Sequence, residues 1–484
     1  MPPKFSPSDY PNNNTIDLIV VLLVSFGLLV TSALTGIFIA YPLLITLGLF
    51  LIVLMRRGFA LRALLKMGLA GARQSLPVVN VLLLIGMLTA VWMAAGTVPA
   101  LVYFGTGLIS PRFFIVWAFL LTSGVSTLMG TSFGAVGTIG IALMVMARSS
   151  DVEIQPVAGA IISGAFVGDR CSPMSSSAHL VASITGTSLY KNLRNMMVSG
   201  FWPLFISIIF YTGLSLFFPA EVKGNLITTE LPKIFDLSPV VLLPATAIVL
   251  LAILRVDVKL AMLVSIGMGC AIAHTLQHYS VLQLTKFILT GYHLDSDTPL
   301  QTILRGGGLL PMAKAILVVL ISTTFAGIFA GSQLLSFTDS WLQHLRSQRQ
   351  LGRATVLVAI ISNIFGCTQT IAILITGKIM QPHYQRYYRD SPSVMKKEQG
   401  QGSEQEQGNE QLSLNLEDTA VVIAPLIPWN IAGLIPATVL AVGPGFIPYA
   451  TYLLLVPLFV FLRNRSLIDG DRPSPLTSEP LATP

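Results

Sequence analysis

The sequence predicts an all-α protein that crosses a membrane many times. Its 484 residues are 53% hydrophobic and only 11% charged, whereas soluble domains carry about 25% charged residues. Lipid offers backbone groups no hydrogen-bond partner, so the spanning segments must be helices. Long stretches lack any Asp, Glu, Lys, Arg or His, namely Leu18–Met55, Gln74–Pro111, Phe113–Ala147, Asn195–Ala220, Ala315–Thr338, Ala354–Gly377 and Thr419–Leu462.

Roughly 20 apolar residues cross a bilayer, so these stretches predict about 11–13 spans. We place them near residues 17–34, 37–55, 76–98, 113–147, 156–188, 198–218, 239–254, 260–276, 312–335, 354–380, 417–440 and 446–462. A further helix near 281–291 is expected to lie at the membrane surface.

The net charge of +7 is placed as in a membrane protein, which argues against a nucleic-acid partner. Basic residues gather in one short loop and after the last span, which predicts that both segments are cytoplasmic. They are Arg56, Arg57, Arg62, Lys66, Arg73, Arg463 and Arg465. Two spans precede the loop, so we expect both termini in the cytoplasm and the protein in a bacterial inner membrane. The N-terminus lacks the features of a signal peptide.

The order of the spans predicts two inverted repeats with broken or re-entrant helices. We expect a cytoplasmic tail (1–16), a first repeat (17–218), a polar link (219–238), a second repeat (239–462) and a cytoplasmic tail (463–484). The Gln/Glu/Lys-rich part of the second repeat, 382–416, is expected to be a disordered cytoplasmic loop. Internal duplication with interrupted helices is typical of transporters whose site lies near the membrane midplane.

The first segment with site chemistry is Met129–Gly137. Its three glycines, with Thr131 and Ser132, favour an unwound stretch whose carbonyls and hydroxyls face a cavity. Hard cations prefer oxygen ligands of this kind. The alternative is a glycine-rich helix contact face.

A matching segment in the second half is Asn363–Thr370. It places amides and hydroxyls, including Asn363 and Thr368, in the middle of a span. These groups need partners in lipid, which either a bound ion or neighbouring helices supply.

The third segment, Gly168–His179, carries charge between two apolar flanks. Asp169 and Arg170 are costly inside a membrane unless they are paired or hydrated, and Pro173 interrupts the helix. Serines 172, 175, 176 and 177 surround the break, so the segment suits a cation site with a titratable group. The alternative is a short cytoplasmic loop with solvated charges.

The fourth segment begins with Glu417 and Asp418 and continues through Pro425, Pro428 and Asn430. The prolines again predict a broken helix. Adjacent carboxylates lie about 100° apart on a helix, so at most one points directly at a given site. Capping of a helix N-terminus by Glu417 is the alternative.

These motifs resemble those of the NhaC-type sodium/proton antiporter family, in the same order, over residues 76–462. The glycine-rich GTS-[FW]-G segment is similar to Gly130–Gly134, and the G-D-[KR]-x-S-P-[LM]-S block to Gly168–Ser175. The family's Arg-Gly-Gly stretch corresponds to Arg305–Gly307. Its L-E-D and P-L-I-P-W-N motifs correspond to Leu416–Asp418 and Pro425–Asn430.

The chain departs from the family pattern at two positions. Ser176 stands where the family commonly has a second Asp, and His179 stands where it has Asn. The missing carboxylate weakens the case for two acids in this segment. His179 could carry a proton near neutral pH, or serve as a hydrogen-bonded structural residue.

The resemblance implies a secondary transporter that exchanges Na⁺ or Li⁺ for H⁺ by alternating access. We expect Asp169 to bind sodium and proton in turn, Asp418 to add a second charge, and Arg170 to pair with Glu417 or a lipid headgroup. The two halves are expected to rock around the site. Candidate Na⁺ ligands are Asp169, Ser172, Ser175, Ser176, Thr131, Ser132, Asn363, Thr368, Asp418 and Asn430; candidates for proton coupling or substrate contact are Asp169, Arg170, His179, Glu417 and Asp418.

Other functions remain open at this point. The family includes branches that exchange malate or lactate, so a coupled carrier of a small organic acid or amino acid is the main alternative, with Arg170 or His179 at the substrate carboxylate. A membrane enzyme or a channel is the alternative from a different class, although a channel would not need a titratable acid at the midplane. The sequence has no motif of an enzyme or of a resident metal or phosphate cofactor, so we expect neither catalysis nor a cofactor. Expected partners are lipid, a small cation and the proton, and the sequence leaves open whether the chain forms a homodimer.

Overall fold

The computed structural model describes residues 15–463 except 109, 151, 220–229, 295–300, 302–303, 333–341, 346 and 390–403. Throughout these residues the regular elements are helices, and an isolated bridge pairs Tyr292 with Gly306. The predicted all-α membrane fold is therefore confirmed. Both predicted tails lie almost wholly outside the described residues.

Six described helices are long and apolar enough to cross a membrane, and a bent pair adds a seventh. Five shorter apolar helices accompany them. Length and composition thus establish a multi-pass protein, whereas the larger number of 11–13 spans stays a prediction.

In the first half the helices are α1 (Thr15–Thr35), α2 (Ala40–Arg56), α3 (Leu61–Gln74), α4 (Leu76–Ala94), α5 (Thr97–Leu108), α6 (Phe114–Met129), α7 (Ser132–Ala135), the π-helical turn Val136–Gly140, α8 (Ile141–Arg148), α9 (Ile154–Cys171), α10 (Ser176–Thr185) and α11 (Leu189–Phe217).

The second half also consists of helices, and its relation to the first half by duplication stays a prediction. Its helices are α13 (Leu243–Ile253), α14 (Val258–Thr275), α15 (Val281–Thr290), α16 (Leu309–Gly331), α18 (Gln348–Gly366), α19 (Gln369–Arg389), α20 (Glu404–Leu416), the π-helical turn Glu417–Val421, the short helix Ala424–Leu426, α21 (Ile431–Val439) and α22 (Thr451–Leu462). Short 3-10 turns, Pro111–Phe113, Pro239–Leu242 and Pro444–Tyr449, precede α6, α13 and α22. The inverted relation between the halves stays a prediction.

Helix α15 forms where a helix was expected, and its place at the membrane surface stays a prediction. Residues 61–74, which were expected to belong to a loop, form helix α3. Helix α3 packs against α16, and α15 packs against α4. The α3–α16 contact depends on glycine, because a Cβ on Gly71 would lie 2.1 Å from the Thr323 carbonyl oxygen and 2.8 Å from the Gly327 Cα. Helices α3 and α15 therefore each pack on a helix from the other half of the chain.

The predicted disordered loop 382–416 is wrong over its described parts. Helix α19 continues through Arg389, and α20 runs from Glu404 to Leu416. Glu and Gln are good helix formers, and α20 packs on α19 with Glu410 and Gln411 buried. Lys191 pairs with Glu410 and compensates its charge. Residues 390–403, like 220–229 of the predicted polar link, lie outside the described residues.

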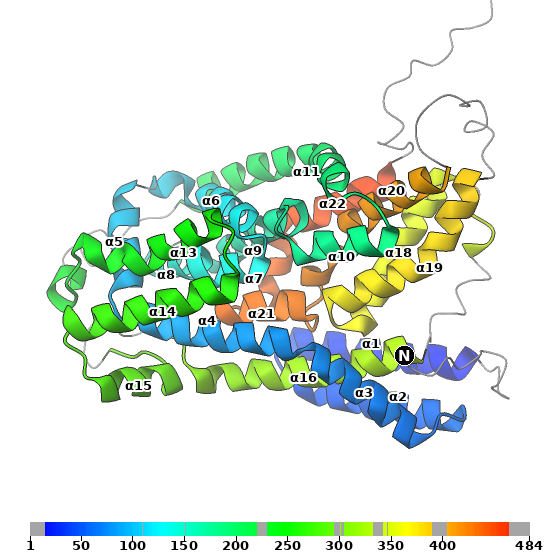
Figure 1. Cartoon of the computed structure of the whole chain (residues 1–484), viewed down its shortest axis with the longest axis horizontal. Helices are drawn as coiled ribbons and strands as arrows, with labels where there is room; N and C mark the ends of the chain where they lie inside the picture. The colour runs from blue at the N-terminus through cyan, green and yellow to red at the C-terminus, as the bar shows by residue number, and fades with distance from the viewer. Residues whose placement is uncertain are drawn as a thin grey trace, which may run out of the picture.

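The helices form two groups, and each group draws on both halves of the sequence. In Figure 1, α1–α4 lie along the lower side with α14–α16, whereas α6, α9–α11, α18–α20 and α22 lie along the upper side. The short helices α7 and α21 lie between the groups. Rocking of the two sequence halves against each other stays a prediction.

Candidate functional site

Two helix breaks of the first half cross each other. Helix α6 ends at Gly130, which adopts a left-handed φ of 66°, and the chain restarts as α7. A Cβ on Gly130 would lie 2.5 Å from the Met174 Cβ and 2.6 Å from its backbone carbon. Met174 belongs to the break between α9 and α10, where Ser175 accepts a hydrogen bond from the Ala178 N–H and caps α10. Glycine is thus needed for the close approach of the two breaks.

Two breaks of the second half cross in a similar way. Helix α18 ends before Cys367, whose φ of 51° is left-handed. The Cys367 carbonyl accepts a hydrogen bond from the Ile431 N–H at 2.9 Å, where α21 begins. The indole of Trp429 donates to the Ile364 carbonyl at 2.8 Å. The predicted broken helices are therefore present, and they meet in pairs.

Asp169 lies near the C-terminal end of α9 and is 5% exposed. Gln369, the first residue of α19, donates through Nε2 to Asp169 Oδ2 at 3.1 Å and to the Val421 carbonyl at 3.2 Å. The backbone N–H of Ser132 also faces the Asp169 carboxyl group. Asp169 therefore connects α9 with the start of α7 and the break before α19. No cationic side chain among the described residues forms an ion pair with it.

Arg170 points to the other side of α9 and forms a buried ion pair with Asp418. Its guanidinium also donates to Ser199 Oγ at 2.6 Å and to the Tyr452 hydroxyl at 3.0 Å. Arg463 Nη2 lies 3.5 Å from the second oxygen of Asp418. The expected pairing of Arg170 with Glu417 or a lipid headgroup is therefore wrong. Two guanidinium groups compensate Asp418, so it contributes no spare negative charge in this conformation.

Glu417 is fully buried, and neither of its carboxyl oxygens has a hydrogen-bond partner among the described residues. Capping is therefore not its role, because a cap requires a hydrogen bond to a backbone N–H. An isolated carboxylate in such a place costs many kcal/mol by solvation alone. Glu417 therefore differs from Asp418, which follows it in the sequence and has two guanidinium partners.

The remaining predicted residues divide into those that position the breaks and those that face outward. Asn363 and Asn430 are bonded to each other, and Asn430 caps α21. Ser172 and Thr368 accept hydrogen bonds from the Met174 and Ile371 N–H groups, while Ser175 donates to the Asp169 backbone carbonyl. Thr131 caps α7. Ser176 and His179 are exposed, and His179 Nδ1 lies 2.7 Å from the Ser175 carbonyl.

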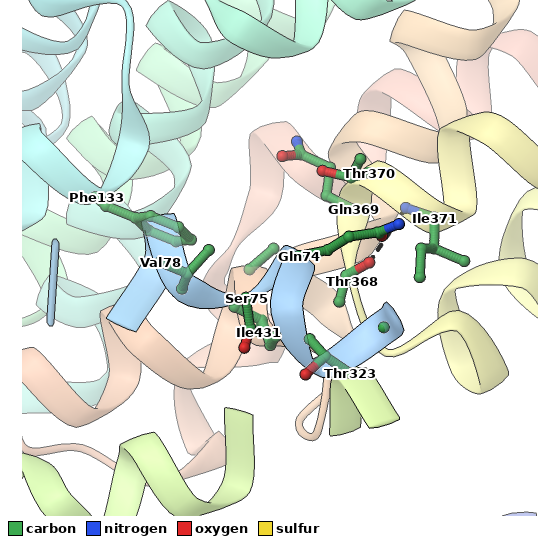
Figure 2. A pocket seen from close by; sticks show the side chains of 12 residues that line it. Gln74, Ser75, Val78, Phe133, Thr323, Thr368, Gln369, Thr370, Ile371 and Ile431 are labelled. Carbon is green, nitrogen blue, oxygen red and sulfur yellow. Dashed lines mark hydrogen bonds between the residues drawn. The ribbon is translucent and has the colours of Figure 1, made fainter. Parts of the chain in front are cut away.

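A cavity of about 100 Å³ lies beside this site, between the two helix groups. Gln74, Ser75 and Thr323 line it from the α3, α4 and α16 side. Across from them lie Phe133, the start of α19 and the start of α21 (Figure 2). Gln369 belongs both to this lining and to the hydrogen bond with Asp169. Gln369 lies in the polar segment Asn363–Thr370. It was not among the predicted site residues, because no pattern of spacing links it to Asp169.

A buried carboxylate at crossed helix breaks within a multi-pass helical bundle defines a membrane transporter of the broken-helix class. A profile of the Na⁺/H⁺ antiporter family matches residues 164–462, and the chain belongs to this family. The matched region contains Asp169, Gln369, Glu417 and Asp418.

Curated relatives align over most of the chain. The Na⁺/H⁺ antiporter NhaC of Alkalihalophilus pseudofirmus is 30% identical over 401 residues, which are 81% of this chain and 82% of the relative. The malate-2H⁺/Na⁺-lactate antiporter of Bacillus subtilis is 26% identical over the same share of each chain. The arginine/ornithine antiporter ArcD of Halobacterium salinarum is 26% identical over 79% of this chain and 77% of its own length. All three relatives are named as antiporters.

Proposed function

We propose that the protein is a secondary active transporter that exchanges Na⁺ or Li⁺ for H⁺ by alternating access. The observation that carries this proposal is the position of Asp169. It is buried at the meeting point of the helix breaks and has no cationic partner among the described residues. Such a carboxylate needs a proton or a metal cation to offset its charge, and either one excludes the other.

The chemistry of exchange follows from this competition. When Asp169 releases its proton, its carboxylate attracts a sodium ion, which also requires several neutral oxygen ligands. Thr131 caps α7 and the Ser132 N–H faces Asp169, so oxygen atoms of these two residues would complete the coordination without adding charge. When a proton returns, the carboxyl group becomes neutral and the sodium ion leaves. Movement of one helix group relative to the other would expose the site to each side in turn.

Asp418 takes a different role in this proposal. Its ion pair with Arg170 spans α9 and the π-helical turn Glu417–Val421. A compensated pair has little net charge to offer sodium, so we assign it to holding the two breaks together. Ser175, Asn363 and Asn430 act in the same way, because their side chains are bonded within the protein.

The membrane and its sidedness belong to the same proposal. We place the protein in a bacterial cell membrane with both termini in the cytoplasm, supported by the basic residues between α2 and α3. The α2–α3 turn, the end of α19 and the start of α20 lie toward the same, right-hand end in Figure 1. Sodium and protons are cargo here, so transport requires no resident cofactor.

The test uses everted membrane vesicles from a bacterial host that lacks its own sodium/proton antiporters. The vesicles are acidified by respiration, and a pH-sensitive dye reports alkalinisation after sodium, lithium or potassium is added. The proposal expects a response to sodium and lithium with the wild-type protein, and none with Asp169→Asn. Comparable expression of both proteins, checked by immunoblot, is the control. A sodium response that Asp169→Asn retains in full would remove the assignment.

A coupled exchanger of small carboxylic acids is the second candidate. Two relatives support it, since they are named for malate and lactate and for arginine and ornithine. Malate, lactate, arginine and ornithine are therefore added to the same vesicles with and without sodium. A pH response that requires one of these compounds would replace pure cation exchange by coupled exchange.

A further inference from the structure

The cavity beside Gln369 is lined by apolar residues together with several hydroxyl and amide groups. The volume of about 100 Å³ leaves room for water, since a cavity needs about 10–15 Å³ to hold one molecule. Its polar lining consists of hydroxyl and amide groups from Gln74, Ser75, Thr323, Thr368, Gln369 and Thr370. Water in a cavity needs two to four polar partners, and this lining supplies them. None of the residues that form the described lining is charged.

The position of the cavity connects it to the candidate site. Gln369 forms part of its wall, and the same amide donates to Asp169 Oδ2 at 3.1 Å. Phe133 also forms part of the wall and directly follows Ser132, whose N–H faces Asp169. Asp169 itself is only 5% exposed. A single layer of side chains therefore separates the cavity from the carboxylate.

The two walls of the cavity belong to different helix groups. Gln74, Ser75 and Thr323 come from the lower group of Figure 1, and Thr368–Ile371 from the upper group. Figure 2 shows side chains of both walls facing the same space. A passage at such a boundary can close when one group moves relative to the other. A cavity within one rigid group could not be closed in this way.

The basic residues indicate on which side the passage opens. Gln74 ends α3, the helix that carries exposed Arg62, Lys66 and Arg73. Basic residues next to spans favour the cytoplasmic side. The mouth of the cavity is thereby assigned to the cytoplasm.

We propose that this cavity is the cytoplasmic access route by which water and hydrated Na⁺ reach Asp169, with Gln369 closing its inner end. The proposal rests on the proposed exchange of Na⁺ for H⁺ and adds the route, its side and the positioning residue. Hydroxyl and amide oxygens along the route replace part of the hydration shell of the ion.

The test places single cysteines in a background free of native cysteines. Cys171 and Cys270 become Ala, and Cys367 becomes Gly, since its φ of 51° lies in the region that glycine tolerates best. Thr370→Cys puts a thiol in the cavity wall, and Gln74→Cys puts one in the opposite wall. Leu374→Cys is the matched control, because it lies one turn further along α19, is 41% exposed and does not line the cavity.

The reagent is a membrane-impermeant, positively charged trimethylammonium methanethiosulfonate, applied to everted and to right-side-out vesicles. We expect Thr370→Cys and Gln74→Cys to react in everted vesicles, where the cytoplasmic face is outside, and to lose most of their sodium/proton exchange. Exchange by Leu374→Cys should survive the same treatment.

Several outcomes would overturn the access route. These are no reaction of either cavity cysteine, reaction only in right-side-out vesicles, or full exchange after complete labelling measured by mass spectrometry. The use of two cavity positions covers the case in which one variant fails to fold. The proposed function fails separately, if the untreated wild-type protein shows no sodium-driven exchange in these vesicles.

Discussion

The guanidinium group of Arg170 and the carboxylate of Asp418 form a buried ion pair between positions 248 residues apart in the sequence. Arg170 is 0% and Asp418 1% exposed. The pair joins the broken helix α9 to the π-helical turn after α20, which come from opposite halves of the chain. Asp169, which precedes Arg170 in the sequence, forms no ion pair with a cationic side chain in the described part of the chain. The charge of Arg170 is thus compensated by an ion pair, whereas that of Asp169 is not.

Removal of one member of this pair should destabilise the protein strongly. Breaking a buried ion pair costs about 3–5 kcal/mol, because the remaining charge is left without compensation. We expect Arg170→Met and Asp418→Asn each to lower the unfolding temperature in detergent, measured by a thermal scan. The double variant Arg170→Met/Asp418→Asn should recover part of the loss. A double variant as unstable as the sum of the two single variants would contradict this account.

Asp169 should be needed for exchange but not for folding. Asp169→Asn keeps the shape of the side chain and removes the charge that binds sodium, so exchange should fall to the level of empty vesicles. Its unfolding temperature should stay at or above that of the wild type, since a buried uncompensated charge is lost. Asp169→Glu serves as the control, because it retains a carboxylate and should keep partial activity. Sodium binding measured by isothermal calorimetry gives the second readout.

Gln369 should set the affinity for sodium rather than the maximal rate. A hydrogen bond to a charged group contributes about 1.5–3 kcal/mol, so its loss in Gln369→Ala should raise the KM for sodium by roughly tenfold or more. The N–H donor favours the ionised carboxylate, so half-maximal exchange should also move to higher pH. Gln369→Asn keeps an amide and should restore part of the affinity. Equal losses in KM and maximal rate, with an unchanged pH profile, would indicate a merely structural role.

The crossing of the breaks at Gly130 predicts a sharp dependence on side-chain size. Gly130→Ala adds a Cβ that would lie 2.5 Å from Met174 and forces alanine into a left-handed conformation. Strain and overpacking of this kind cost about 1–3 kcal/mol. Gly124→Ala in α6 is the control, since nothing lies within 4 Å of its Cβ position. We expect a lower unfolding temperature for the first variant only, by the same thermal scan.

Exchange itself should show competition between sodium and protons. If one carboxylate binds either ion, the apparent KM for sodium rises as the pH falls, while the maximal rate at saturating sodium changes little over the same range. Initial rates in proteoliposomes at several internal and external pH values measure this. A KM independent of pH would show that the two ions bind at separate groups.

Much of the membrane fold could be predicted from the sequence, because uncharged runs and proline or glycine breaks act locally. The four segments around Gly130, Pro173, Asn363 and Pro425 were identified in this way, and each contains a helix break. Helix α20 was missed because its Gln/Glu-rich composition resembles that of a solvated loop. Its burial depends on partners such as Lys191, which lies far away in the sequence.

The residue types that form the site could be predicted from the sequence, but the pairs that they form could not. Sequence alone places Asp169, Arg170, Glu417 and Asp418 in broken helices, but it cannot decide which acid faces which base. That decision depends on the rotation of α9 and on the π-helical turn at Glu417, which shifts the register of the following side chains. The contact between Gln369 and Asp169 spans 200 residues and has no local signal.

The long separation between Arg170 and Asp418 has a consequence for synthesis of the chain. At about 5–20 residues per second, a ribosome needs roughly 12–50 s to proceed from one residue to the other. During this interval Arg170 belongs to a nascent segment whose counter-ion does not yet exist. We therefore expect the final placement of α9 to be a late step that depends on synthesis of the second half.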